Sequence, residues 1–292
     1  MLISQIIWYK SNYISPFLFC QAESAGNCYN YLRGGMKKQN SPQLRQEIIT
    51  RNVMEKGWVS VEELVETLGV SRMTVHRDLD ELEDSGVLRK VRNGASVQPS
   101  SLFESDYRYR ITQQSTEKRA ICERAASFIE PGTSLMMDDS TTVMPLVEFF
   151  PRIESLTVIT HFLPVIQHLS IQRNVHLIAL GGEYLPQFET FIGILCQQAI
   201  ASLRADACFL SASACDAGEL YHPETELINM KRAMMKQCIQ KYLLLDHSKF
   251  GRIALHRLAS LKEFDCVITD SKIDPEHLKM LKDNAQRVEV AG

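Results

Sequence analysis

The most regular alternation of apolar and polar positions lies between Ser60 and Ala95. Apolar residues recur there at helical spacing, first at Val61, Leu64, Val65 and Leu68 and then at Val75, Leu79 and Leu82. Only Gly69 and Val70 separate the two sets. Two amphipathic helices joined by so short a turn predict a helix-turn-helix.

The residues around these helices supply start and stop signals. Ser60 followed by Glu63 predicts a capping box for the first helix, and Ser71 predicts the cap of the second. Beyond the second helix, residues 87–91 and 95–97 flank Asn93-Gly94, a dipeptide typical of tight hairpin turns. The hairpin completes the pattern of a winged helix-turn-helix.

The second helix and the wing carry the candidate DNA-contacting residues. A recognition helix contacts base edges with its first turns, where Arg suits guanine and the methyl group of Thr suits thymine. Cations on a wing suit phosphate contacts, which position the domain without specifying sequence. The candidates are Ser71, Arg72, Thr74, His76 and Arg77 on the helix and Arg89, Lys90 and Arg92 on the wing.

Charge alone does not identify a DNA-binding protein here. The chain has a formal net charge of −3, and acidic residues nearly balance basic ones between residues 37 and 97. The positive charge is local, at the start of the second helix and on the wing, and an electrostatic footprint need cover only one face of a domain. The two helices alone leave an alternative open, namely a helix-turn-helix in a protein that does not bind DNA.

Residues 1–35 do not continue the pattern of the rest. Their apolar runs are interrupted by polar residues and fall short of the roughly 20 residues that a membrane span requires. We expect a non-native or disordered extension, with Met36 as the natural start. Ser41-Pro42 then opens a helix that runs to about Lys56, and Trp58 follows in a short extended segment, where we expect it in the core.

The composition of residues 98–114 predicts a linker between a winged helix (36–97) and a larger domain (115–292). The linker contains Tyr107-Arg108-Tyr109-Arg110, an alternation that suits stacking on nucleic acid or, as we favour, a hinge or subunit interface. Ser115 is predicted to cap a helix over residues 116–129.

From residue 131 onward, short apolar runs alternate with amphipathic stretches of helical length, such as 143–150, 193–203 and 224–240. The predicted strands are 134–137, 156–160, 175–180, 207–211, 242–245, 266–269 and 287–290. This alternation predicts an α/β domain with a mostly parallel sheet covered on both faces.

Polar residues follow several of these strands, at the edge where ligands bind in such sheets. Amide and hydroxyl groups at the start of a helix favour an anion, Gly-Gly permits close backbone approach, and a lysine pairs with phosphate. The candidate effector-binding residues are Asp139, Ser140, Thr141, Thr142, Gly181, Gly182, Asp216 and Lys249. Each cluster alone has an ordinary structural explanation, but together they predict a small anionic ligand.

The eight cysteines are scattered and form no C-x-x-C motif. Structural zinc needs convergent ligand pairs, and disulfide frameworks are typical of short secreted chains. We therefore expect buried reduced thiols in a cytoplasmic protein, and no metal or cofactor.

The run VSRMTVHRDLDELEDSGVLRKVRNGA resembles the DNA-binding domain of the DeoR family of bacterial transcriptional regulators. That family has two adjacent arginines where this chain has His76-Arg77, and a His-Gly-Gly-Ala wing where it has Arg92-Asn93-Gly94-Ala95. The resemblance covers nearly everything from Met36 to the end and includes Asp-x-Ser-Thr-Thr, Leu-Gly-Gly and Asp-His-Ser-Lys-Phe-Gly segments. It implies a regulator, with operator DNA as its partner.

The sensor domain of that family resembles the ribose-5-phosphate isomerase fold. The resemblance implies a phosphorylated sugar as effector, with residues 139–142 at its phosphate and Lys249 at the sugar, and a homo-oligomeric repressor of a carbohydrate operon without membrane attachment. The alternative is a sugar-phosphate isomerase-like enzyme. The family position of the isomerase base falls near Lys231, a cation that cannot take a proton, while Glu224 and Glu226 stay open as displaced bases.

Overall fold

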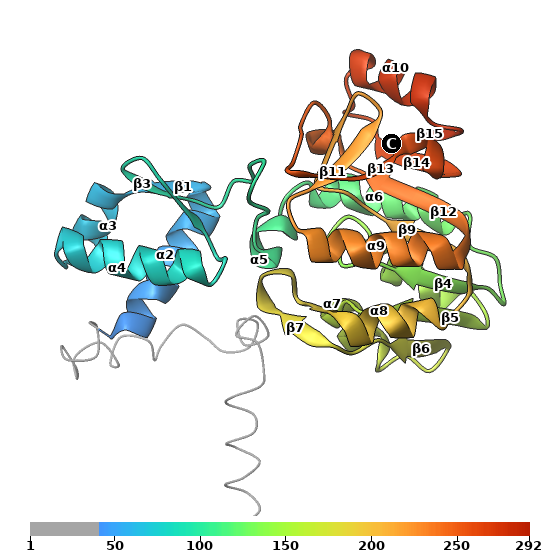
Figure 1. Ribbon diagram of the computed structural model, residues 1–292, viewed down its shortest axis with the longest axis horizontal. Coiled ribbons are helices and arrows are strands. Elements are labelled where there is room, and N and C mark those ends of the chain that lie inside the picture. Colours follow the sequence, from blue (N-terminus) through green and yellow to red (C-terminus); the bar gives the residue numbers. More distant parts are fainter. Residues whose placement is uncertain (1–40) are drawn as a thin grey trace, which may run out of the picture. The chain divides into compact units, whose positions relative to one another are not determined.

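The computed structural model describes residues 41–292, and Figure 1 shows their helices and strands. The expected extension 1–35 and the expected start at Met36 lie outside the described residues. The N-terminal part is a winged helix with α2 (Pro42–Lys56), α3 (Val61–Leu68) and α4 (Arg72–Asp84). Its sheet has the order β1-β3-β2, formed by β1 (Trp58–Ser60), β3 (Gly94–Ser96) and β2 (Arg89–Val91).

The predicted helix-turn-helix is confirmed, including most of its caps. The Ser60 hydroxyl accepts a hydrogen bond from the backbone of Glu63 at 3.1 Å, and Ser71 caps α4 in the same way at 3.2 Å. Gly69 has the left-handed φ of 62° that ends α3. The second half of the expected capping box is replaced, because the Glu63 carboxylate forms an ion pair with Lys56.

The expected burial of Trp58 is wrong. Trp58 is 45% exposed, whereas Val59 is fully buried. Successive strand residues point to opposite faces, so only one of the two can face the core of the winged helix. The indole of Trp58 instead lies against Gly94, where an added Cβ would be 3.0 Å from its Nε1 atom.

The hairpin of the wing turns one residue earlier than expected. Val91 pairs with Gly94, so the two turn residues are Arg92 and Asn93, and Asn93 has a φ of 62°. Gly94 therefore serves another purpose: an added Cβ there would lie 2.4 Å from the carbonyl oxygen of Val59. Its missing side chain lets β1 and β3 approach.

The C-terminal part is an α/β domain built on a seven-stranded sheet in which all pairs are parallel. The sheet has the order β15-β14-β12-β9-β4-β5-β6. Its strands are β4 (Ser134–Met137), β5 (Leu156–Thr160), β6 (Val175–Ala179), β9 (Ala205–Leu210), β12 (Cys238–Leu245), β14 (Cys266–Asp270) and β15 (Val288–Ala291). All the predicted strands are confirmed as members of this one sheet.

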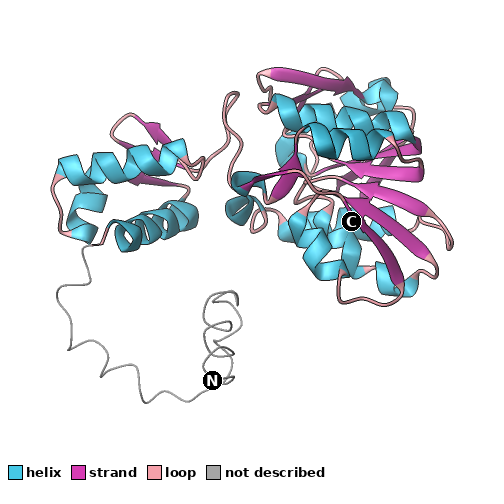
Figure 2. Ribbon diagram, turned by 60° about the horizontal axis from the view of Figure 1, so that its bottom comes forward, coloured by secondary structure: helices cyan, strands magenta, loops and turns pink. Residues whose placement is uncertain are grey.

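Helices cover both faces of this sheet, as predicted (Figure 2). One face packs against α6 (Ser115–Ala126), η3 (Met144–Glu148), η4 (Phe150–Arg152) and α7 (Leu163–Leu169). The other packs against α8 (Ile194–Ala201), α9 (Thr225–Gln237) and α10 (Pro275–Asn284). Strand β4 contributes to both cores. Leu135 and Met137 belong to the core on the α6 and α7 side, and Met136 belongs to the core on the α8 and α9 side.

Two local expectations for this domain are wrong. The stretch 143–150 forms short 3-10 segments instead of an α-helix, and Pro151 lacks the backbone N–H that a helix continuing through it would need. Ser115 is the first residue of α6 and not its cap, since the cap position is Gln114, whose φ is 47°.

Small elements that the sequence pattern did not predict surround the sheet. They are α5 (Tyr107–Arg110), the hairpin β7 (Glu183–Leu185) and β8 (Thr190–Ile192) with η5 (Pro186–Phe188), the sheet of β10 (Ala214–Asp216), β11 (Glu219–His222) and β13 (His256–Ser260), and the turns η6 (His247–Lys249) and η7 (Leu261–Glu263). In the described part of the chain, no helix is long and apolar enough to cross a membrane.

Candidate anion-binding site and DNA-binding surface

The chain changes direction in the sheet between β4 and β9. It adds β5 and β6 on one side of β4 and then returns to place β9 on the other side. Ligands of open α/β sheets bind beyond the carboxyl ends of the strands at such a point. Asp138 joins the loops that follow β4 and β9. Its Oδ2 accepts from the Ser211 N–H at 2.8 Å, and its Oδ1 accepts from the Ser140 N–H at 3.0 Å.

A buried ion triad lies under these loops. Lys231 of α9 donates from Nζ to Asp138 Oδ2 at 2.6 Å and to Asp139 Oδ1 at 2.9 Å, and all three residues are at most 1% exposed. Burial alone would lower the pKa of Lys231, but the two carboxylates raise it above its ordinary value. Burial would raise the pKa of Asp139, but chiefly Lys231 holds it below its ordinary value. Lys231 and Asp139 are therefore both charged at neutral pH.

The two histidines beside the triad are neutral at neutral pH. Burial, reinforced by the Lys231 charge, lowers the pKa of His222 to about 3. Burial likewise lowers the pKa of His161 from its ordinary value, although Asp139 opposes the shift. Positive charge for an anionic ligand must come from other residues.

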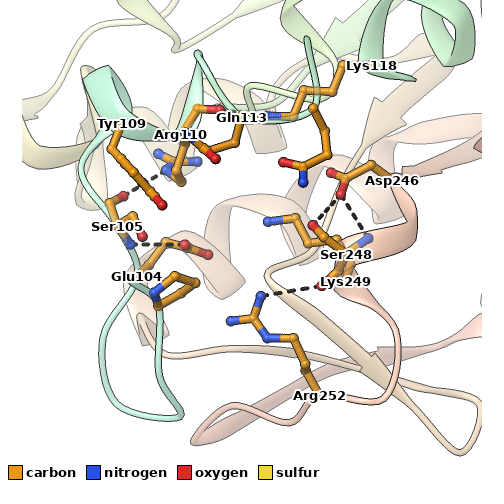
Figure 3. Close-up of a pocket in the computed structure, with 12 residues that line it drawn as sticks. Glu104, Ser105, Tyr109, Arg110, Gln113, Lys118, Asp246, Ser248, Lys249 and Arg252 are labelled. Carbon is orange, nitrogen blue, oxygen red and sulfur yellow. Dashed lines mark hydrogen bonds between the residues drawn. The ribbon is translucent and has the colours of Figure 1, made fainter. Parts of the chain in front are cut away.

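Cationic side chains line a cavity of about 170 Å³ (Figure 3). Its cationic lining consists of Arg110, Lys118, Lys249 and Arg252. A smaller adjoining cavity shares Glu104, Arg110 and Lys249 with the first and reaches the hydroxyls of Ser140, Thr141 and Thr142. The two cavities form one site, which we call the switch-point pocket, and its chemistry suits a small anion with hydroxyl groups.

Lys118 is buried at the wall of this pocket on α6. Its Nζ donates to the Arg110 carbonyl at 2.6 Å and to Thr141 Oγ1 at 3.1 Å. Burial, with repulsion from Lys249 as the next cause, lowers the pKa of Lys118 to about 7. Asp246 opposes the shift but does not cancel it. The charge of Lys118 therefore changes near neutral pH.

This pKa predicts a pH-dependent affinity for anions. The Lys118 ammonium is charged below about pH 7 and loses its proton as the pH rises through that value. We expect the affinity for sulfate, whose charge is constant in this range, to fall between pH 6 and pH 8.5 as measured by calorimetry. Lys118→Met should weaken binding at pH 6 and flatten the profile. An equally steep profile in that variant would contradict the assignment.

The structure brings together only part of the predicted effector site. Ser140, Thr141, Thr142 and Lys249 line the switch-point pocket together with Asp139. The stretch 139–142 does not open an α-helix as expected, because the segment that follows it, η3, is a 3-10 helix of only five residues. An anion there depends on side chains and loop amides and not on a helix dipole.

The remaining predicted residues lie elsewhere. Gly181 and Gly182 follow the edge strand β6 and do not line the switch-point pocket. Gly182 allows a close backbone approach to Ile192, since an added Cβ would lie 2.3 Å from the Ile192 carbonyl oxygen. Asp216 pairs with Glu219 in the β10–β11 hairpin, also outside the pocket lining.

Several pocket residues were not predicted. They are Glu104, Arg110, Lys118, Ser213, His222 and Arg252. Lys118 carried a usable signal, because it shares the buried face of α6 with Ile121 and Cys122, where a lone cation needs a partner. Arg110 belongs to the Tyr-Arg alternation that we interpreted as a hinge or interface.

The candidate DNA-contacting residues fall into two groups. Arg72 forms an ion pair with Glu62 at 2.8 Å, Lys90 forms one with Asp80, and Arg89 donates to the Gln98 carbonyl at 3.1 Å. Ser71 and Thr74 are joined by their hydroxyls at 3.0 Å in the cap of α4. His76 is half-buried on α4.

Arg77 and Arg92 are exposed, and within residues 41–292 neither has an ion-pair partner. They are thus the cations of the set that are available to DNA without breaking a contact. Because Arg92 lies in the wing turn, we expect it to contact phosphate. Arg92→Ala should weaken binding to specific and random DNA alike and reduce the salt slope by about 1 in a fluorescence anisotropy series. An unchanged salt slope would contradict this role.

Two family matches account for both parts of the chain. Residues 45–101 match the DeoR-like helix-turn-helix domain, and residues 113–271 match the DeoR C terminal sensor domain. The chain belongs to the DeoR family of transcriptional regulators. The α/β part is therefore this family's sensor domain, and the winged helix is its DNA-binding domain.

Similar proteins include other regulators. The chain is 32% identical over 229 residues to the uncharacterized HTH-type transcriptional regulator YgbI of Escherichia coli K12, which covers 78% of this chain and 90% of that protein. It is 34% identical over 241 residues to the lactose phosphotransferase system repressor of Staphylococcus aureus NCTC 8325, with 82% and 95% covered.

Similar solved structures include ribose-5-phosphate isomerase A of Methanocaldococcus jannaschii, with 13% identity, a TM-score of 0.35, and 46% of this chain and 54% of that chain covered. The translation initiation factor eIF-2B of Pyrococcus horikoshii OT3 has 11% identity and a TM-score of 0.37, with 76% and 81% covered. These likenesses are too distant to assign a function.

Within residues 41–292, no group of His, Cys, Asp and Glu side chains forms a metal site. The cysteines of the same range, Cys122, Cys196, Cys208, Cys215, Cys238 and Cys266, are buried free thiols, as expected.

Proposed function

We propose that this DeoR-family regulator represses an operon for the use of a sugar and that a phosphorylated sugar bound in the switch-point pocket controls it. The observation that carries the proposal is the cationic lining of Arg110, Lys118 and Lys249 beside the hydroxyls of Ser140 and Thr141. A relative named for repression of a lactose phosphotransferase system supports the sugar assignment.

The pocket offers suitable groups for each part of such a ligand. Lys249 and the Arg110 guanidinium provide charge-assisted hydrogen bonds to a phosphate, which are stronger than those between neutral groups. The hydroxyls of Ser140, Thr141 and Ser213 can donate to or accept from the hydroxyls of a sugar. Effector and DNA then bind to different domains of the same chain.

We propose that the regulator acts in the cytoplasm as a homo-oligomer. A helix-turn-helix dimer binds two half-sites whose spacing matches the distance between its recognition helices. An effector that binds one arrangement of the subunits more tightly shifts the population toward it and so changes that match.

We favour a sensor over an isomerase. An isomerase needs a carboxylate base at the sugar carbon. The family resemblance puts that base near Lys231, a cation that donates to Asp138 and Asp139 and cannot take a proton. Glu224 and Glu226, the displaced bases left open by the sequence, do not line the switch-point pocket.

A binding experiment tests the effector site. Calorimetry of the full chain with a panel of sugar phosphates should identify a ligand, and Lys249→Met should weaken its binding roughly tenfold or more, because a charge-assisted hydrogen bond is lost. Lys262→Met, which removes an exposed lysine outside the pocket, should leave affinity unchanged. Equal affinities for both variants would contradict the proposed site.

A further inference from the structure

The switch-point pocket contains an anionic side chain of its own. Glu104 belongs to the linker 98–114, is 3% exposed and lines both parts of the pocket. Its Oε1 accepts from the Ser105 N–H at 3.0 Å, and its carbonyl accepts from the Gln187 side chain at 2.8 Å. Figure 3 shows Glu104 and Lys249 on opposite sides of the same cavity, with Arg110 beside them.

The surroundings keep the Glu104 carboxyl group ionised. Burial alone would raise its pKa, but Lys249, Arg110 and the other polar neighbours outweigh burial and lower the pKa of Glu104 to about 2. The carboxylate is therefore a fixed negative charge among the cations that a ligand phosphate would need.

The Arg110 guanidinium is only partly satisfied in this arrangement. Its Nε donates to the Ser105 carbonyl at 2.8 Å. Its Nη2 is buried without a hydrogen-bond partner among the described residues. A buried guanidinium nitrogen without a partner is costly, and an anion in the pocket would supply one.

We propose that Glu104 is an internal counter-anion of the effector site, which the phosphate of the effector displaces, and that its release loosens the linker leading to the DNA-binding domain. The inference rests on the proposed binding of an anion in the switch-point pocket. A phosphate and the Glu104 carboxylate repel each other, and both are attracted by Lys249 and Arg110, which line the same cavity. Displacement would couple the arrival of an anion to movement of the linker that leads to the DNA-binding domain.

The proposal makes a prediction that a ligand-contacting role for Glu104 does not. Removing the competing charge should strengthen the binding of any anion, whereas a glutamate that accepts hydrogen bonds from sugar hydroxyls should affect only sugars. Glu104→Gln keeps the shape of the side chain and removes its charge. Repulsion between like charges a few ångströms apart is worth roughly tenfold in affinity, so we expect about tenfold tighter binding of inorganic phosphate.

Calorimetry with inorganic phosphate on the full chain tests this expectation. Glu104→Gln should bind phosphate about tenfold more tightly than the wild type, and Glu276→Gln, which removes an exposed carboxylate on α10, should match the wild type. Wild-type binding without a gain in Glu104→Gln overturns the inference and leaves the proposed effector site intact. Failure of both proteins to bind phosphate overturns the inference together with that site.

Hydrogen exchange provides a second test, whose main comparison is between the wild-type protein with and without phosphate. Saturating phosphate should speed amide exchange in residues 98–114, because the buried Glu104 side chain would leave the cavity that it now lines. In Glu104→Gln the exchange should already be fast without phosphate. Slower exchange of the wild-type linker on addition of phosphate would show that the ligand fastens the linker, and would overturn the proposal.

Discussion

Lys231→Met should lower the free energy of unfolding by about 3–5 kcal/mol, the cost of leaving buried carboxylates without their cation. The ammonium group of Lys231 lies 2.6 Å from Asp138 Oδ2 and 2.9 Å from Asp139 Oδ1, with all three side chains buried. Urea denaturation followed by circular dichroism at 222 nm measures the change. A variant that is already unfolded without urea would also agree with this prediction, because its loss of stability would then exceed the stability of the native protein.

A matched exposed lysine provides the control. Lys272 forms an ion pair with Glu117, but its side chain is 66% exposed, so Lys272→Met should leave the denaturation midpoint nearly unchanged. Adding Asp139→Asn to Lys231→Met should restore part of the lost stability, because it removes one uncompensated charge. A loss in Lys231→Met no larger than in Lys272→Met would contradict a stabilising role for the buried ion pairs of Lys231.

Arg77→Ala should weaken binding to the specific operator by about 1–3 kcal/mol, because Arg77 is exposed on the recognition helix α4 and has no ion-pair partner within residues 41–292. A contact to a base edge distinguishes sequences, whereas a phosphate contact does not. Fluorescence anisotropy at one fixed salt concentration, with operator and random duplexes of equal length, measures the two affinities.

The comparison between duplexes decides the role of Arg77. We expect the loss on operator DNA to exceed the loss on random DNA. Arg92→Ala serves as the matched control, since it removes an exposed arginine of the wing and should affect both duplexes alike. Equal losses of affinity on both duplexes for Arg77→Ala would show that Arg77 contacts phosphate and would contradict its proposed contact with a base.

The sequence predicted the elements whose signals are local. A buried strand needs a run of apolar residues, and β4 and β5 have the bounds expected from theirs. The helix-turn-helix was also predictable, since caps such as Ser71 and the left-handed Gly69 act within a few residues. Trp58 was misplaced because its hydrophobicity indicates burial, while the alternation of β1 gives that position to Val59.

The lining of the switch-point pocket was only partly predictable, because it depends on contacts between distant segments. Thr141 and Lys249 follow strands, and the rule for strand ends found both. The same rule also selected Gly182 and Asp216, since a sequence does not reveal which strand ends adjoin the change of direction in the sheet. Glu104 has no local signal in the sequence, because the residues that line the pocket with it, such as Thr141 and Lys249, are distant along the chain.

One titration tests the central claim that this chain is a DNA-binding regulator controlled by a small anionic sugar. The full chain is added to labelled DNA from upstream of its own gene, with and without each member of a panel of sugar phosphates, and the bound fraction is measured by anisotropy. We expect specific binding that one sugar phosphate alters and that inorganic phosphate or the free sugar alters less. Absence of DNA binding even at low salt, or specific binding that no sugar phosphate changes, would contradict the account.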